Sequence, residues 1–91
     1  MPDIDFRNPI ATLSNNTDYT VNVDEAYLFG QLRGFNSTSS LVINGVTILG
    51  AASTQTISLT FFKVNRGDII RRTTSDATAI SDTYVKVYVP K

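Results

Sequence analysis

The side chains with the most chemical potential in this sequence lie between residues 66 and 76. Arg66-Gly67-Asp68 matches the tripeptide that integrin ligands display, and Arg71, Arg72 and Asp76 follow it. Because guanidinium groups bind carboxylates and phosphates through paired N–H donors, the three arginines are candidates for a patch that accepts an acidic sugar or a phosphate. The alternative is structural, with one of Arg71 and Arg72 solvated and the other paired with Asp68 or Asp76.

A turn accounts for the tripeptide without any ligand. Gly67 supplies a positive φ angle, and the Asp68 side chain can accept a local hydrogen bond. We therefore interpret residues 65–68 as a turn between two strands, with adhesion through the tripeptide as the alternative. Under either interpretation, Arg66 and Asp68 are candidate recognition residues.

Catalytic groups are scarce in the 91 residues. The chain has no His and no Cys, which removes imidazole acid–base chemistry, thiolate nucleophiles and the commonest transition-metal ligands. Asp24-Glu25 is the only adjacent pair of acids, and carboxylate pairs hydrolyse glycosides only at set separations across a cleft. Turn chemistry explains Asp24 equally well. The sequence predicts no enzyme, no catalytic residue, and no metal or other cofactor.

Charge and hydropathy exclude two further classes of partner. Eight Lys and Arg balance eight Asp and Glu, which argues against nucleic acid because its binders usually carry a basic excess. No run of about 18 apolar residues is present, and the first five residues carry acid where a signal peptide carries Lys or Arg. We expect a protein made in the cytoplasm, with no membrane insertion.

The elements that must position these side chains are strands. Twelve Thr, eight Val and eight Ile make the chain rich in β-branched residues, which favour the pleated surface of a sheet. Alternation predicts strands over residues 18–23, 26–33, 41–43, 46–48, 54–64, 69–73 and 83–89, with a helix over 26–33 as the alternative there. Asn44-Gly45 between apolar runs predicts a tight type I′ hairpin.

Strand phase predicts which side chains face the core. Ile57, Leu59 and Phe61 share one face, whereas Phe62 and Val64 fall out of phase, which indicates either a bulge or a strand whose outer face becomes buried at that point. About six to eight short strands at this spacing predict an all-β fold, an antiparallel β-sandwich or jelly roll over residues 18–91.

The first 17 residues read as an extended N-terminal arm. Pro and Asn interrupt what little alternation they have. Three apolar side chains in this stretch are candidate anchors to another chain: Phe6, Ile10 and Leu13.

Two further surfaces are candidates for recognition and assembly. The loops 34–40, 50–54 and 74–82 are rich in small polar residues suited to adaptable hydrogen bonding, and the first contributes Asn36, Ser37, Thr38 and Ser39 as candidates. Aromatic residues exceed what one core face can enclose, so either a second layer or another subunit covers the rest. The candidate interface residues are Phe62, Tyr84 and Tyr88. Because a chain this small buries only about 60–65% of its surface, we expect a homo-oligomer.

The order of the turn motifs resembles that of a known family. Residues 18–27, 41–46, 62–70 and 85–91 are similar, in order and spacing, to small β-sandwich head modules at the tips of bacteriophage tail fibres and related virion appendages. In those modules a Tyr-Thr-Ala-Pro-x-Asp-Gly strand entry, a Val-Asn-Gly hairpin, a Lys-Gly-Asp turn and a terminal Phe-x-Pro segment recur. This chain departs from the pattern at Val23, Glu25-Ala26 and Arg66, which stand where the family has Pro, Gly-Trp and Lys.

The resemblance implies a non-enzymatic virion protein from a phage tail or head appendage. It implies a homotrimer that binds a host-surface glycan or protein, or caps a longer fibre, and it transfers no catalytic residue. In this context residues 1–17 are expected to dock onto another virion protein or a neighbouring subunit. Two alternatives remain: a lectin-like module whose loops hold a glycan, and a capsid decoration protein that stabilises the shell.

Overall fold

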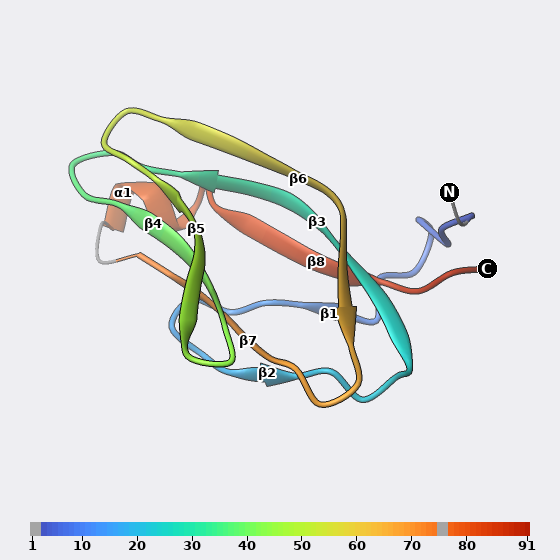
Figure 1. The fold of residues 1–91 in the computed structure, drawn as a ribbon. Helices are drawn as coiled ribbons and strands as arrows, with labels where there is room; N and C mark the ends of the chain where they lie inside the picture. The colour runs from blue at the N-terminus through green and yellow to red at the C-terminus, as the bar shows by residue number, and fades with distance from the viewer. Residues whose placement is uncertain (1–2, 75–76) are drawn as a thin grey trace.

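In the residues that the structure describes, the chain forms eight strands and one helical turn (Figure 1). The computed structural model describes residues 3–74 and 77–91. The elements are β1 (Ala11–Thr12), β2 (Tyr19–Thr20), β3 (Glu25–Arg33), β4 (Ser39–Ile43), β5 (Val46–Ala51), β6 (Thr56–Asn65), β7 (Ile69–Thr73), α1 (Ala77–Ile80) and β8 (Tyr84–Tyr88). Residues 26–33 are therefore strand and not helix.

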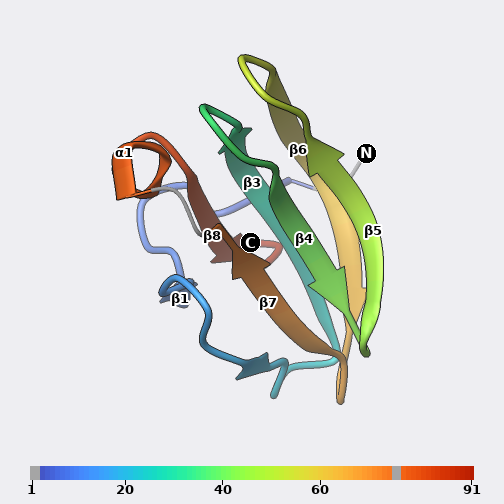
Figure 2. The same cartoon turned by 90° about the vertical axis from the view of Figure 1, so that its left-hand side faces the viewer.

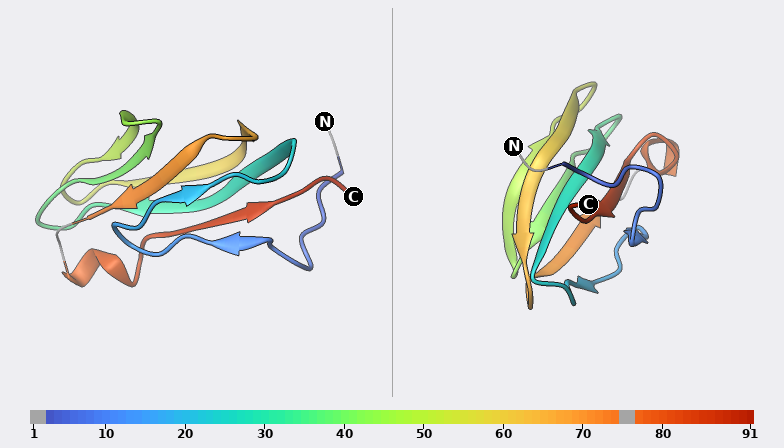
Figure 3. Two further views of the ribbon diagram at one scale, coloured as in Figure 1. Left: turned by 90° about the horizontal axis from the view of Figure 1, so that it is seen from below. Right: turned by 90° about the vertical axis from the view of Figure 1, so that its right-hand side faces the viewer.

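The strands form two four-stranded antiparallel sheets packed face to face (Figures 2 and 3). One has the order β1-β8-β3-β6 and the other β2-β7-β4-β5. Because strands that are distant in sequence are neighbours in each sheet, the connections wrap around the sandwich as in a jelly roll. The predicted all-β sandwich or jelly-roll class is confirmed.

The core lies between the sheets and follows the predicted alternation. From the first sheet, Leu28 of β3 and Val85 and Val87 of β8 are fully buried, and they share one apolar cluster with Leu41 of β4 and Ile70 of β7. Each of these side chains alternates with an outward-facing neighbour, as the period of a strand requires.

The bulge predicted in residues 54–64 lies in β6. Leu28 pairs with Phe62, but Gly30 pairs with Leu59, so one extra residue is accommodated in β6, and Phe61 has a φ of 51°. Such a bulge reverses the phase of the side chains that follow it. Phe61, which simple alternation placed beside Leu59, therefore turns to the outer face. Phe62 is partly buried and packs against the core, and its place at a subunit interface stays a prediction.

The hairpin between β4 and β5 has the predicted Asn-Gly turn. Asn44 and Gly45 have φ angles of 52° and 80°, which match the two positive values of a type I′ turn. Ile43 and Val46 pair directly across the turn. This tight connection fixes the position of Asn44 at one end of the second sheet.

The N-terminal segment runs along β8 and forms the edge of the first sheet. Ile4 forms a bridge with Pro90, Ala11 pairs with Val87, and the Leu13 N–H donates to the Val85 carbonyl at 2.9 Å. Leu13 is 3% exposed and belongs to the core. The segment that we predicted as a separate arm thus contributes an edge strand, too short to show alternation in the sequence.

None of the helical residues that the structure describes forms a segment long and apolar enough to cross a bilayer.

Candidate functional site

The three arginines singled out in the sequence do not converge on one patch. Arg66 Nε lies 2.8 Å from Asp24 Oδ1, and Arg71 Nε lies 2.8 Å from Asp18 Oδ1. Arg72, the next residue along β7, points the other way because successive side chains on a strand alternate between faces. The predicted anion patch of Arg66, Arg71 and Arg72 is therefore not formed.

Arg72 serves as an internal polar contact between strands. It is 8% exposed, and its Nε donates to the Leu13 carbonyl at 3.0 Å, which ties the N-terminal segment to β7. Burial lowers the pKa of its guanidinium. Within residues 3–74 and 77–91, Arg72 Nη1 has no hydrogen-bond partner. Asp76, which with Asp68 was a predicted ion-pair partner for Arg71 or Arg72, lies outside the described residues.

Asp68 organises the turn between β6 and β7. Its Oδ2 accepts a hydrogen bond from the Asn65 N–H at 2.8 Å, and its Oδ1 accepts from Asn44 Nδ2 at 3.1 Å. The hydrogen bonds from Asn65 and Asn44 lower the pKa of the Asp68 carboxyl. Asn44 in turn accepts from the Ile69 N–H at 2.9 Å. The charged side chains of the Arg-Gly-Asp tripeptide are thus both engaged in contacts within the chain.

The predicted recognition loop 34–40 is partly internal. Asn36, Ser37 and Thr38 lie in the connection between β3 and β4. Ser39 instead begins β4, is fully buried, and donates through Oγ to the Arg33 carbonyl at 2.6 Å. Because a buried serine needs this partner, Ser39 has a structural role and its assignment as a surface recognition residue is wrong.

Five aromatic side chains gather on the outer surface of the β1-β8-β3-β6 sheet, and we call this group the aromatic face. Phe29 lies at its centre, with ring centroids 5.0 Å from those of Phe6 and Phe61 and 5.6 Å from that of Tyr88. Tyr27 extends the group through Phe61 at 6.3 Å. All of these pairs are edge-to-face, which is a favoured geometry for aromatic rings.

The border of the aromatic face mixes apolar and charged groups. Phe6 and Tyr84 are 54% and 46% exposed. Lys63 and Glu25 form an ion pair at 3.5 Å beside Tyr27, and burial, together with the Glu25 carboxylate, raises the pKa of the Tyr27 hydroxyl. The predicted outward positions of Tyr84 and Tyr88 agree with the burial of Val85 and Val87.

Of the five members of the aromatic face, the sequence analysis names Tyr88 alone as a candidate interface residue. Phe6 is predicted as an anchor in the N-terminal arm, and Phe61 is predicted to share the face of Leu59 because the predicted bulge follows it. The signal available in the sequence was the pair Tyr27 and Phe29, which alternate with the buried Leu28 and so mark an aromatic outer surface.

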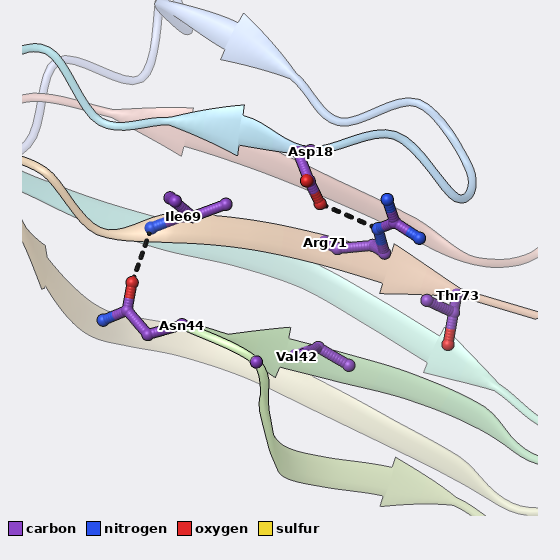
Figure 4. A pocket seen from close by; sticks show the side chains of 7 residues that line it. Asp18, Val42, Asn44, Ile69, Arg71 and Thr73 are labelled. Atoms are coloured by element: carbon purple, nitrogen blue, oxygen red, sulfur yellow. Dashed lines mark hydrogen bonds and ion pairs between the residues drawn. The ribbon is translucent and has the colours of Figure 1, made fainter.

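The opposite sheet carries a pocket of about 480 Å³ on its outer surface (Figure 4). We call it the sheet pocket, and its lining residues are Asp18, Val42, Asn44, Gly45, Ile69, Arg71 and Thr73. Arg71 is the one member of the predicted arginine patch that reaches it. The sequence did not indicate that Arg71 pairs with Asp18, which is 53 positions away in the chain.

Metal ligands do not cluster in the part of the chain that the structure describes: no group of three or more Asp or Glu side chains is close enough to hold an ion.

Comparison with known proteins identifies the fold and no family. No family model and no curated protein matches the sequence. Among solved structures, the crystal structure of GITRL from bushbaby is similar, with a TM-score of 0.60 and 19% sequence identity over 93% of this chain and 80% of that chain. At this identity the similarity defines the chain as a jelly-roll domain and shows nothing finer.

Proposed function

We propose that this chain is a non-enzymatic structural protein of a bacteriophage virion, a homotrimeric tail-tip or head appendage module that contributes to host attachment or virion assembly. The virion assignment is supported by the order of turn motifs shared with tail-fibre head modules. The observation that carries the assembly role is the aromatic face, because it gathers rings on one outer surface of a small sandwich.

The composition of the aromatic face suits an interface between subunits. Tyr and Phe are enriched in protein interfaces, and buried aromatic anchors dominate their energetics. Phe6 is more than half exposed although its ring contacts Phe29 and Tyr88. A second copy seated on this sheet would remove that apolar surface from water, which is the main driving force for association. The Lys63–Glu25 pair would then lie at the rim.

The N-terminal segment is part of this proposed interface. Leu13 is held by the core of its own domain, whereas Phe6 and Ile10 are 54% and 40% exposed. Because Phe6 belongs to the aromatic face, a neighbouring subunit is the partner that its position favours. In our proposal, Ile10 contacts another virion protein. The loops make the contacts with the host.

Light scattering on the purified protein tests the assembly state. We expect a mass about three times the 10.0 kDa of the monomer. A monomer at micromolar concentration would contradict the proposal.

Electron microscopy of particles made with and without this gene product tests the location. We expect density for an appendage that disappears in its absence, together with reduced adsorption to the host. Particles that adsorb normally but have a weakened shell would instead indicate a capsid decoration protein.

A further inference from the structure

The sheet pocket has a polar side and an apolar side. The polar side is the ion pair of Asp18 and Arg71, whose side chains are 57% and 42% exposed. The apolar side is formed by Val42 of β4 and Ile69 of β7 (Figure 4). A volume of about 480 Å³ falls within the range of about 300–1,000 Å³ that is typical of small-molecule sites.

The ion pair leaves hydrogen-bonding capacity directed at the pocket. It uses Arg71 Nε and Asp18 Oδ1. Within the described residues, the other Asp18 oxygen, the terminal Arg71 nitrogens and the Thr73 hydroxyl have no hydrogen-bond partner in the protein. An acceptor and a set of donors are thus held side by side, because Asp18 directly precedes β2 and Arg71 directly follows Ile70, the β7 partner of Tyr19.

The charge of the pair selects the class of ligand. Asp18 neutralises Arg71, and an anionic ligand at the guanidinium would also meet the Asp18 carboxylate. A neutral ligand whose adjacent hydroxyl groups both donate and accept satisfies the two side chains together: one hydroxyl donates to Asp18 and the next accepts from Arg71. The C–H face of a sugar ring would cover Val42 and Ile69.

We propose that the sheet pocket binds a neutral saccharide through a pair of adjacent hydroxyl groups. Asp18 accepts from one hydroxyl, Arg71 donates to the other, and Thr73 extends the polar contact. Asn44 is held by Asp68 and the Ile69 N–H, and so forms a fixed end wall. This site lies on the sheet opposite the aromatic face, so it does not depend on the proposed subunit assembly.

Titration of the isotope-labelled protein by nuclear magnetic resonance tests the proposal. The probes are methyl α-D-mannopyranoside, methyl α-D-galactopyranoside and methyl α-D-glucopyranoside, with inorganic phosphate and N-acetylneuraminic acid as anionic comparisons. We expect at least one neutral glycoside to shift the amide signals of Arg71 and Thr73 while leaving those of Phe29 and Tyr88 unchanged. No shift with any neutral glycoside, or tighter binding of the anions, would overturn the proposal.

Matched variants assign the contact. Arg71→Met keeps the apolar stem and removes the donors, so we expect the affinity for the glycoside to fall about tenfold or more. Arg66→Met removes a guanidinium from a comparable exposed ion pair outside the pocket and should bind as the parent does. Thr73→Val is a second variant of nearly the same shape and should weaken binding by less. Unchanged affinity in Arg71→Met, with a native spectrum, would overturn the assignment.

Discussion

The two sheets of this jelly roll share one core but have different outer surfaces. The β1-β8-β3-β6 sheet presents edge-to-face rings around Phe29, whereas the β2-β7-β4-β5 sheet presents the Asp18–Arg71 pair beside Val42 and Ile69. Covering such rings with a flat partner is favourable because it removes apolar surface from water. An ion pair that lines a pocket instead suits a small polar ligand. In our proposals the same scaffold therefore separates a surface for assembly from a surface for recognition.

Balanced net charge is consistent with this division. The ion pairs Lys63–Glu25, Arg66–Asp24 and Arg71–Asp18 each cancel locally within the described part of the chain. Charges that cancel within a pair add little electrostatic opposition to close contact between identical subunits.

The largest expected effect comes from the core that both surfaces share. Leu28 is fully buried beneath Phe29 and Tyr27. Leu28→Ala leaves a cavity, and we expect it to lower the free energy of unfolding by about 2–5 kcal/mol, which should weaken both assembly and glycoside binding. Urea unfolding measures the loss, and Val46→Ala, at a residue 59% exposed in β5, is the control that should change little. If Leu28→Ala lowered the free energy of unfolding no more than Val46→Ala does, the role of Leu28 in the shared core would be contradicted.

The next largest effect should separate the two surfaces. Phe29→Ala removes the central ring of the aromatic face and leaves the sheet pocket intact. We expect the dissociation constant of the oligomer to rise roughly thirtyfold, in line with a loss of about 2 kcal/mol at an interface anchor.

Analytical ultracentrifugation measures this change, with the glycoside titration run on the same sample. An oligomer as stable as that of the parent protein would place the subunit interface elsewhere on the molecule. Loss of glycoside binding together with assembly would show that the two surfaces are not independent.

The smallest effect concerns the end wall of the sheet pocket and depends on pH. Because the folded protein lowers the pKa of Asp68 below its unfolded value, its contribution to stability is present above about pH 4 and is lost as the pH falls through the folded pKa. Asp68→Asn should therefore be less stable than the parent near neutrality, and the two should converge in acid.

Thermal unfolding between about pH 7 and pH 2 measures this difference. Asp24→Asn, at the exposed ion pair with Arg66, serves as the control on a neighbouring turn. A stability gap between the Asp68 variant and the parent that stays constant with pH would contradict the role assigned to the carboxylate.

Local features were readable from the sequence wherever one strand or one turn decided them. Asn44-Gly45 requires positive φ angles whatever surrounds it, and Val85 and Val87 alternate with Tyr84 and Tyr88 within a single strand. The turn role of Asp68 likewise depends on Asn65, three residues away. Each of these predictions rests on neighbours in the chain, and the structure agrees with all of them.

Features that depend on contacts between distant segments were predicted poorly. Ser39 is predicted in a loop, but it begins β4 and its hydroxyl donates to the Arg33 carbonyl. Leu13 is predicted to anchor another chain, but β1 pairs with β8 and Leu13 belongs to the core of its own domain. Alternation places Phe61 beside Leu59, but Phe61 lies on the outer face because the position of the bulge in β6 is set by the pairing of β6 with the distant strand β3.

The sequence by itself determined that this chain is a small all-β domain, because β-branched composition, alternation and turn residues act locally. Only the tertiary structure decided which strands are neighbours. That arrangement in turn forms the aromatic face and the sheet pocket. Phe6 meets Phe29, and Asp18 meets Arg71, because the jelly-roll connections bring together segments far apart in the chain. Those connections follow from how two sheets bury one shared core, which no local pattern specifies.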